Sequence, residues 1–304
     1  MEITNANLDK IREALNIQWQ AGVEHGSKID ISFLFDVRES TTKAEAYAWL
    51  ERIPGFREWL GDRVFHDVVS RLHELTNRDW EDSVKVGIND IEDDQIGLFS
   101  DIVRWMGSGW EELKYELIVD TILNNDQTFD GVAVFSDSHV KGYHSALDNL
   151  TTDTFSAAAY EAAFLAASTW RWEDDNRENG RPCRTTFTHL LHGEKIADTV
   201  FDVVGARQVS DGAGGNLDNR HYQEVTPVKI PEFTGDYENF WMLADCSDIV
   251  KPFVLQLRKD AHPMMTNDAT YVMEHKAAVY HADGRAAATP SFPHLLYGGR
   301  TPAS

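Results

Sequence analysis

Cysteine is almost absent from this sequence of 304 residues, which contains only Cys183 and Cys246. The two residues lie far apart in the chain, and neither belongs to a CxxC motif. Paired cysteines at short spacing are the usual sign of a zinc site or a disulfide framework. We therefore expect two reduced, buried thiols rather than a disulfide or a metal site.

Basic residues are also few, since 28 Lys and Arg stand against 50 Asp and Glu and give a formal charge of −22. A protein that grips nucleic acid normally presents a stripe of Lys and Arg, and the sequence has no such cluster. If the protein meets DNA, this charge is typical of a container wall rather than a sequence reader. Negative charge also keeps a concentrated protein in solution, and this simpler explanation stays open.

Long apolar runs are absent as well. No stretch approaches the roughly 20 apolar residues that span a bilayer, and the segment from Met1 to Gln20 lacks the features of a signal peptide. The sequence therefore predicts synthesis in the cytoplasm without membrane insertion. A hydrophobic content of 42% and a charged content of 26% are typical of a globular protein, and the length allows about two domains.

Catalytic motifs are missing too: HExxH and GxSxG do not occur, and the glycines of the GAGG run in 210–219 do not follow a strand in GxGxxG form. With 50 acidic residues, the carboxylate pairs that glycoside hydrolases use are expected by chance. Two histidine groups, His189 with His192 and His139 with His144 and Asp137, are better explained as core or surface residues than as metal ligands. The sequence thus identifies no catalytic or cofactor-binding residue, although an acidic carbohydrate-active enzyme is kept as an alternative.

Residues 126–137 give a partial match to a calcium-binding loop. The positions one, three, five, six and twelve of that template fall on Asp126, Thr128, Asp130, Gly131 and Asp137. Thr replaces the usual carboxylate at the third position, and Asp replaces the bidentate Glu at the twelfth. The favoured interpretation is a solvated Asp-Gly turn, which leaves Asp126, Asp130 and Asp137 as a weak metal candidate.

The most regular pattern in the chain lies in residues 89–124. Apolar side chains recur there at steps of three and four, as in one face of a helix: Phe99, Val103, Met106, Trp110, Leu113 and Leu117. Acidic residues in 90–94 favour the helix N-terminus, whereas Gly107 and Gly109 each cost ~1 kcal/mol and predict a bend or a close crossing. Such a long helix is either a central core helix or a rod that joins two parts of an elongated subunit.

Other elements are expected on both sides of this helix. An amphipathic helix over 1–21 should bury Leu8, Ile11, Leu15 and Trp19, with Asn5 or Asn7 as its cap and Gly22 as its end. Further helices are predicted at 155–172 and 193–205. Strands are predicted at 29–37, 84–88, 185–191, 222–230, 240–243, 249–257 and 270–280, and the tail 286–304 is expected to be irregular.

Large aromatic side chains are concentrated in residues 47–60. Trp49, Phe56 and Trp59 surround a turn at Pro54-Gly55. Exposed aromatic residues of this size promote association unless something covers them. The segment therefore either folds back on its own core or is covered by another subunit, and the pattern does not decide between the two.

Four stretches of the chain, taken in order, resemble one known family. They are YAWLERIPGFREWLGDR (47–63), NRDWEDSVKVGINDIEDDQIG (77–97), FDGVAVFSDSH (129–139) and DCSDIVKPFVLQLRK (245–259). These stretches are similar to the Mu-like major head subunit of tailed phages and prophages, and the resemblance covers roughly residues 31–284. Val140 in place of a proline, and RKDAHP in place of a shorter acidic continuation, are local departures that concern loop geometry.

The resemblance implies an α+β architecture, the Hong Kong 97-type capsid fold. By this analogy, residues 1–30 are an N-terminal arm, and 31–88 an extended loop with its flanking strands. Residues 89–152 are a peripheral domain with the spine helix, and 153–246 an axial domain. Residues 247–304 return to the peripheral domain and form the tail.

The resemblance also implies a major capsid protein, not an enzyme, that assembles as hexamers and pentamers into an icosahedral head. Such a head encloses double-stranded DNA without sequence-specific binding, and needs neither a cofactor nor a membrane. The implied contacts between subunits are Trp49, Pro54, Phe56, Trp59 and Arg63. The implied partners are a scaffolding protein, a portal and, in some cases, a decoration protein. The expected location is the virion capsid, assembled in the cytoplasm of the bacterial host, and the alternative within this fold is the shell of a cellular nanocompartment.

Overall fold

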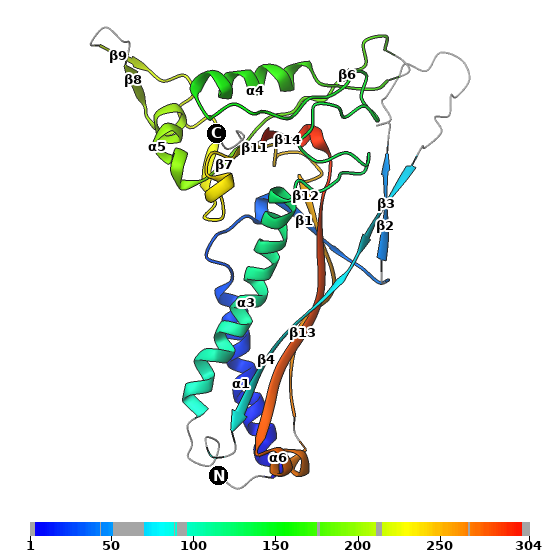
Figure 1. Ribbon diagram of the computed structural model, residues 1–304, viewed down its shortest axis with the longest axis vertical. Helices are drawn as coiled ribbons and strands as arrows, with labels where there is room; N and C mark the ends of the chain where they lie inside the picture. Colours follow the sequence, from blue (N-terminus) through cyan, green and yellow to red (C-terminus); the bar gives the residue numbers. More distant parts are fainter. Residues whose placement is uncertain are drawn as a thin grey trace.

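Two long helices and a long sheet form an elongated body, here called the rod, beneath a second part, here called the upper lobe (Figure 1). The computed structural model describes residues 4–42, 44–50, 70–87, 89, 96–174, 177–210, 215–266 and 268–299, with only the backbone given for 44–50, 70–73, 96–98 and 269. The rod contains α1 (Asn5–His25), α3 (Ile96–Leu123), α6 (Ala269–His275), β1 (Phe35–Glu39), β4 (Arg78–Gly87), β12 (Phe253–Met265) and β13 (Ala277–Pro290).

The helix α3 is the axis of the rod. Its 28 residues span about 42 Å at ~1.5 Å per residue, and α1 packs along it. Of the apolar stripe, Phe99, Val103, Met106, Trp110 and Leu117 are buried and Leu113 is partly buried. The predicted long helix is therefore confirmed over Ile96–Leu123, while the acidic segment 90–94 lies outside the described residues.

Gly22 and Gly107 meet where α1 crosses α3. A Cβ atom on Gly107 would overlap the carbonyl oxygen of Trp19, and one on Gly22 would overlap the carbonyl oxygen of Arg104. The close crossing predicted from the glycines is thus confirmed for Gly107. Gly109 has no such neighbour within 4 Å, so it plays no part in the crossing.

The first helix buries the four predicted residues, but its ends differ from the prediction. Thr4 is the cap, because its side-chain oxygen accepts a hydrogen bond from the Asn7 amide at 3.3 Å. The helix continues through Gly22 and stops before Gly26, whose φ is 69°. Packing against α3 keeps Gly22 helical despite the low helix propensity of glycine.

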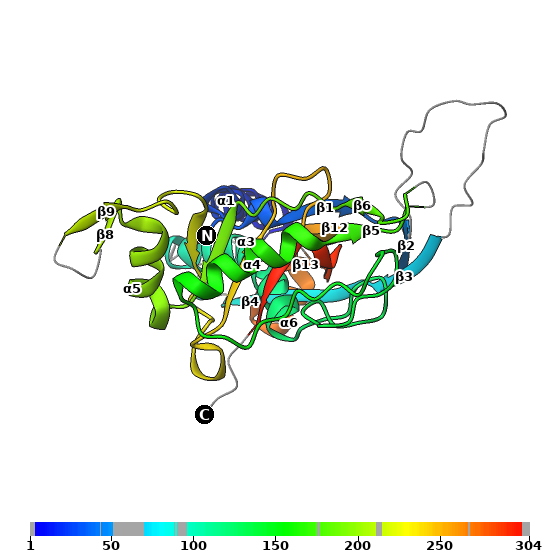
Figure 2. The ribbon, with the colours of Figure 1, turned by 90° about the horizontal axis from the view of Figure 1, so that it is seen from above.

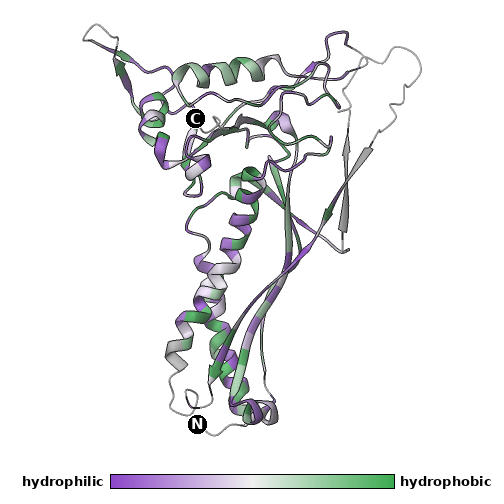
Figure 3. Cartoon of the chain, viewed as in Figure 1, coloured by the Kyte–Doolittle hydropathy of each residue, from purple (hydrophilic) through white to green (hydrophobic). Residues whose placement is uncertain are grey.

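The rod sheet has the strand order β1-β12-β13-β4, in which β1 is parallel to β12 and the other pairs are antiparallel. Segments from both ends of the chain therefore form one sheet. In Figure 3, β4 is largely hydrophilic, whereas β13 is mainly hydrophobic at both of its ends. The first strand starts at Phe35, later than predicted, because Ser32–Leu34 forms a 3-10 turn.

The C-terminal part of the chain departs most from the prediction. Residues 269–275 are helical rather than extended, because the Asp268 carboxylate accepts a hydrogen bond from the Thr270 amide at 2.9 Å and caps α6. Lys276, with a φ of 49°, ends this helix before β13 begins. Within 286–299, expected to be irregular, β13 continues to Pro290 and β14 (Leu296–Gly299) pairs with β11. Sheet pairing there overrides the weak strand preference of Ala, Pro and Gly.

The upper lobe is built on a second sheet with the order β10-β7-β11-β14. It comprises α4 (Ala157–Thr169), β5 (Arg171–Trp172), β6 (Arg181–Pro182), β7 (His189–His192), α5 (Ala197–Val200), a π-helical turn (Phe201–Gly205), β8 (Gln208–Ser210), β9 (Asn216–Asp218), β10 (Thr226–Lys229), β11 (Trp241–Ala244) and β14, with short 3-10 turns at Glu194–Ile196, Gly235–Tyr237 and Pro293–Leu295. Its core surrounds Trp241 and Tyr160, which are fully buried. Cys183 and Cys246 are both free thiols; Cys246 is buried, as predicted, whereas Cys183 is only partly buried. Among the described residues, no helix is both long and apolar enough to cross a bilayer.

Candidate assembly surfaces

A two-stranded hairpin projects from the side of the rod (Figures 1 and 2). It consists of β2 (Ala44–Leu50) and β3 (Ser70–Thr76). Leu50 lies opposite Ser70, at the end where residues 51–69 connect the two strands. Within the described part of the chain, these two strands form a sheet of their own. An isolated two-stranded hairpin is at best marginally stable in water, so this one depends on contacts beyond its own strands.

The base of the hairpin is fixed to the rod by side-chain hydrogen bonds. The buried Gln256 of β12 donates from Nε2 to the carbonyl oxygen of Leu75 at 3.2 Å. Asn77 donates from Nδ2 to Ser40 Oγ and to the carbonyl oxygen of Thr42, both at 3.2 Å. These bonds determine where the hairpin leaves the rod.

The subunit contacts implied by the resemblance lie on or beyond this hairpin. Trp49 belongs to β2, opposite Arg71 in the strand register, and its side chain is not described. Pro54, Phe56, Trp59 and Arg63 belong to segment 51–69, outside the described residues. The contact set therefore stays a prediction.

Several large apolar side chains on the described surface were missed by the sequence analysis. The most exposed are Ile249 at 95%, Trp105 at 74% and Leu165 at 70%. Single exposed apolar residues are common, but a tryptophan this exposed on the rod is a good candidate for a subunit contact. The exposure of Trp105 and Leu165 could have been predicted, because neither residue is at a position that belongs to the buried apolar repeat of α3 or α4.

The weak metal candidate forms a hydrogen-bonded turn. Asp130 is 1% exposed, and its Oδ1 accepts hydrogen bonds from Thr128 Oγ1 at 2.6 Å and from the Val132 amide at 2.9 Å. Its Oδ2 lies 2.8 Å from Nδ1 of the fully buried His139. Both carboxylate oxygens thus have protein partners, whereas Asp126 and Asp137 are exposed.

The electrostatics of this turn follow from the same contacts. Burial raises the pKa of Asp130, but the hydrogen bonds from His139, Thr128 and the Val132 amide outweigh it, and the net pKa lies below the ordinary value. His139 Nε2 also lies 3.2 Å from the Val134 carbonyl oxygen. Both ring nitrogens of His139 therefore face oxygen atoms of the protein.

The remaining histidines of the sequence analysis do not converge. His192 is buried and its Nδ1 lies 2.9 Å from the Gly193 carbonyl oxygen, while His189 stacks on Phe33 with ring centroids 3.9 Å apart. Burial lowers the pKa of both imidazoles. His144 is exposed. In the described ranges, no group of three or more His, Cys, Asp or Glu could hold a metal ion.

Chelation of calcium should leave the thermal stability of the protein unchanged, because the Asp130 carboxylate is engaged by protein donors. Differential scanning calorimetry with and without EDTA measures this directly. A marked fall in the melting temperature on chelation would restore the calcium site at 126–137.

Comparison with known proteins identifies the family of this chain. Residues 8–177 and 216–303 match the family described as Mu-like prophage major head subunit gpT. The chain belongs to this family. Its members are structural head subunits, not enzymes.

Two relatives with curated names are similar to parts of this Mu-like head subunit. The Mu-like prophage FluMu major head subunit of Haemophilus influenzae is 30% identical over 137 residues, which are 42% of this chain and 44% of that protein. The major capsid protein of Escherichia phage Mu is 25% identical over 172 residues, 53% of this chain and 55% of that protein. The chain thus spans about half the length of the curated relatives it matches.

Solved structures identify the fold of this Mu-like head subunit. A bacteriophage JBD30 procapsid subunit is similar with a TM-score of 0.54 and 18% identity, over 96% of this chain and 75% of that chain. A subunit of the mature capsid of bacteriophage PhiM1 gives 0.52 and 11% identity, over 88% and 84%. The α+β, Hong Kong 97-type capsid fold is therefore confirmed.

Proposed function

We propose that this chain is the major capsid protein of a Mu-like phage or prophage, which self-assembles as hexamers and pentamers into an icosahedral head. The observation that carries the proposal is the projecting β2–β3 hairpin on an elongated subunit of this family and fold. A hairpin that is marginal alone gains stability when a neighbouring subunit covers it. Many such contacts, repeated by symmetry, close a shell.

The parts of the subunit take the following proposed roles. Residues 1–30 are the N-terminal arm, 31–88 the extended loop with its flanking strands, and 89–152 with 247–304 the peripheral domain. The upper lobe within 153–246 is the axial domain, which meets its copies at the centres of hexamers and pentamers. The net charge of −22 suits a wall that encloses double-stranded DNA without adhering to it.

The proposed partners follow from the same function. A closed head that is filled with DNA needs an entry vertex, which is the role of a portal, and a scaffolding protein that sets its curvature. A decoration protein is a further partner of such a shell. The proposed location is the virion capsid, after assembly in the cytoplasm of the bacterial host.

Family membership favours this proposal over the two alternatives. A nanocompartment shell of the same fold would enclose a cargo enzyme and have no portal, and no observation points to it. An acidic carbohydrate-active enzyme would need a convergent pair of carboxylates in a cleft, and the family is structural.

Electron microscopy of the purified protein after a sizing column tests the proposal. Closed icosahedral particles, or hexamers and pentamers, are the expected result. If the protein stays monomeric, co-expression with a scaffolding protein is the next step, and a monomer that persists there contradicts the proposal.

Trp59→Ala should leave the subunit folded and impair shell formation. The physical reason is that this substitution removes a large apolar side chain that is expected to contact another subunit. The yield of particles by microscopy and the circular dichroism of the subunit measure the two effects separately. Particles in normal yield from the variant would refute the assigned contact.

A further inference from the structure

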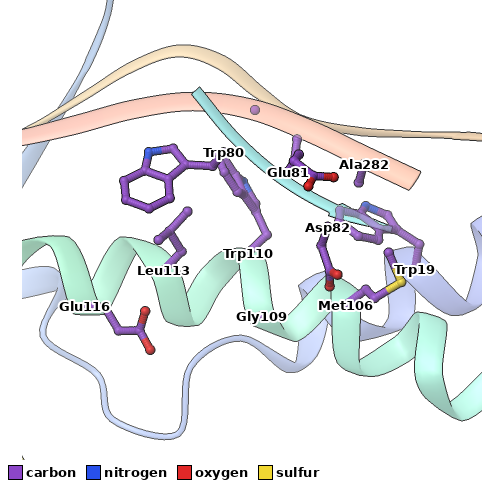
Figure 4. Close-up of a pocket in the computed structure, with 12 residues that line it drawn as sticks. Trp19, Trp80, Glu81, Asp82, Met106, Gly109, Trp110, Leu113, Glu116 and Ala282 are labelled. Atoms are coloured by element: carbon purple, nitrogen blue, oxygen red, sulfur yellow. The ribbon is translucent and has the colours of Figure 1, made fainter. Parts of the chain in front are cut away.

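A small groove opens on the rod between α3 and the strands β4 and β13 (Figure 4). Three tryptophans and three carboxylates are among the residues that line it: Trp19, Trp80, Trp110, Glu81, Asp82 and Glu116. Its volume of about 210 Å³ is below the roughly 300–1,000 Å³ of small-molecule sites. The groove therefore fits one or two side chains of a protein partner better than a cofactor.

The floor of the groove is aromatic and held in place by the rod. Trp19 and Trp110 are buried, whereas Trp80 is partly exposed. Trp80 donates from Nε1 to the Ala286 carbonyl oxygen at 3.1 Å, and Trp110 donates from Nε1 to the Asp260 carboxylate. Because these rings are already fixed, a ligand that packs on them does not have to order them first.

A carboxylate stands on the inward face of β4, where the strand pattern calls for an apolar residue. Trp80, Asp82 and Val84 are two residues apart, so their side chains share one face of the strand. Trp80 and Val84 pack against the core of the rod, whereas Asp82 is exposed in the groove. Glu116 of α3 lies at the opposite end of the groove (Figure 4). The aromatic floor is therefore bounded by a carboxylate at each end.

The groove has an excess of negative charge, because no Lys or Arg is among the described residues that line it. Three basic residues that are close to the lining residues in sequence pair with other carboxylates: Lys114 with Glu111, Lys259 with Asp283 and Arg285 with Asp79. Lys114 also lies 5.6 Å from the centre of the Trp110 ring, so the edge of the floor already accommodates a cation.

The environment of Glu116 points the same way. Burial, followed by the nearby carboxylates of Glu112, Asp120 and Glu232, raises the pKa of Glu116. A cation beside Glu116 would offset this repulsion.

An arginine side chain matches the groove in shape and charge. Its guanidinium group stacks on aromatic rings, pairs with carboxylates and is more weakly hydrated than an ammonium group. Its aliphatic part can cover Met106 and Leu113, which also line the groove. Because β4 is an edge strand of the rod sheet, a segment of a partner protein has room to lie beside the groove.

We propose that the groove between α3, β4 and β13 binds arginine side chains from a basic segment of another protein. One guanidinium group stacks on Trp80 and pairs with Asp82, and a second cation pairs with Glu116. The partner is a protein other than this chain, because this sequence contains no cluster of Lys and Arg that could supply the segment. The inference goes beyond the proposed function and does not depend on shell formation.

A titration of dispersed wild-type subunits with short synthetic peptides tests the proposal. The probe is acetyl-Gly-Arg-Gly-Arg-Gly-amide, which contains no tryptophan, so the indole fluorescence of the subunit reports its binding. Saturable binding of one peptide per subunit is expected. The peptide with lysine in place of arginine should bind more weakly. The peptide with citrulline, which keeps the shape of the guanidinium group but not its charge, should not bind. Absence of saturable binding, or equal binding of either replacement peptide, overturns the proposal.

Substitutions in the groove locate the binding site. Asp82→Asn with Glu116→Gln removes both charges and should weaken binding by about tenfold, and both residues are exposed, so the core is spared. Glu13→Gln with Glu24→Gln removes the same charge from the exposed face of α1, outside the groove, and should leave the affinity unchanged. Unchanged affinity in the groove variant, or an equal loss in the α1 control, refutes the assigned site whether or not shells form.

Discussion

Gly107→Ala should destabilise the subunit by about 1–3 kcal/mol, whereas Gly109→Ala on the same helix should stabilise it by ~1 kcal/mol. The two substitutions add the same methyl group to the same helix. They differ in what that group meets. At Gly107 it would overlap the Trp19 carbonyl oxygen, whereas nothing lies within 4 Å of it at Gly109.

The opposite signs arise from two competing terms. Replacing glycine by alanine in a helix reduces the conformational entropy of the unfolded chain, which favours folding at both positions. At the crossing, α1 and α3 would have to separate to admit the methyl group, and this would loosen the packing of Trp19 and Met106 between them. The packing loss exceeds the entropic gain.

Urea unfolding of the two variants, followed by circular dichroism, measures both free energies of unfolding on one scale. Gly22→Ala is a second test, because a methyl group there would overlap the Arg104 carbonyl oxygen from the other side of the crossing. Equal stabilisation at Gly107 and Gly109 would show that the helices do not cross closely at Gly107.

Asp130→Ala should lower the free energy of unfolding by about 1–3 kcal/mol, the cost of leaving a buried hydrogen-bonding group without its partner. The substitution takes an acceptor from Thr128 Oγ1 and from the Val132 amide, and removes the oxygen that contacts His139 Nδ1. Asp137→Ala is the matched control in the same loop. Because Asp137 is exposed, its loss should change stability by less than about 0.5 kcal/mol.

The same contacts fix the sign of a pH effect. The pKa of Asp130 is lower in the folded state than its ordinary value of 3.8, so its contribution to stability is present above that value. The contribution is lost as the pH falls through the lower, folded pKa. Wild-type protein should therefore lose more stability than Asp130→Ala below about pH 4. Parallel stability profiles for the two proteins in this range would contradict the lowered pKa of Asp130.

Local patterns in the sequence were enough to predict the helices of the rod. The buried apolar residues of α1, and those of α3 from Phe99 to Leu117, recur at the helical period. This period is visible in residues only three or four positions apart in the sequence. Residues 270–275 were predicted to be part of a strand over 270–280 because this short apolar run fits either period. The segment is helical because the Asp268 side chain caps its N-terminus, and the spacing of apolar residues does not reveal a capping residue.

Contacts between distant segments could not be predicted in the same way. The Asp-Gly spacing at 126–131 occurs in both a calcium loop and a hydrogen-bonded turn, and only the position of His139 against Asp130 distinguishes them. The groove combines Trp19, Trp80 and Trp110 from three elements, and nothing in their spacing places them together. Family motifs did indicate the capsid fold, because they are long and occur in the expected order.

The pairing of β4 with β13 also sets the order of events during synthesis. Trp80 lies opposite Gly284 in the register, and the upper lobe apart from its last turn and β14 is translated between them. At ~5–20 residues per second, this interval lasts about 10–40 s. Neither sheet can be completed in that time, because the rod sheet needs β13 and the upper sheet needs β14, the last two strands to be translated. Both sheets of a subunit are therefore completed only at the end of its synthesis.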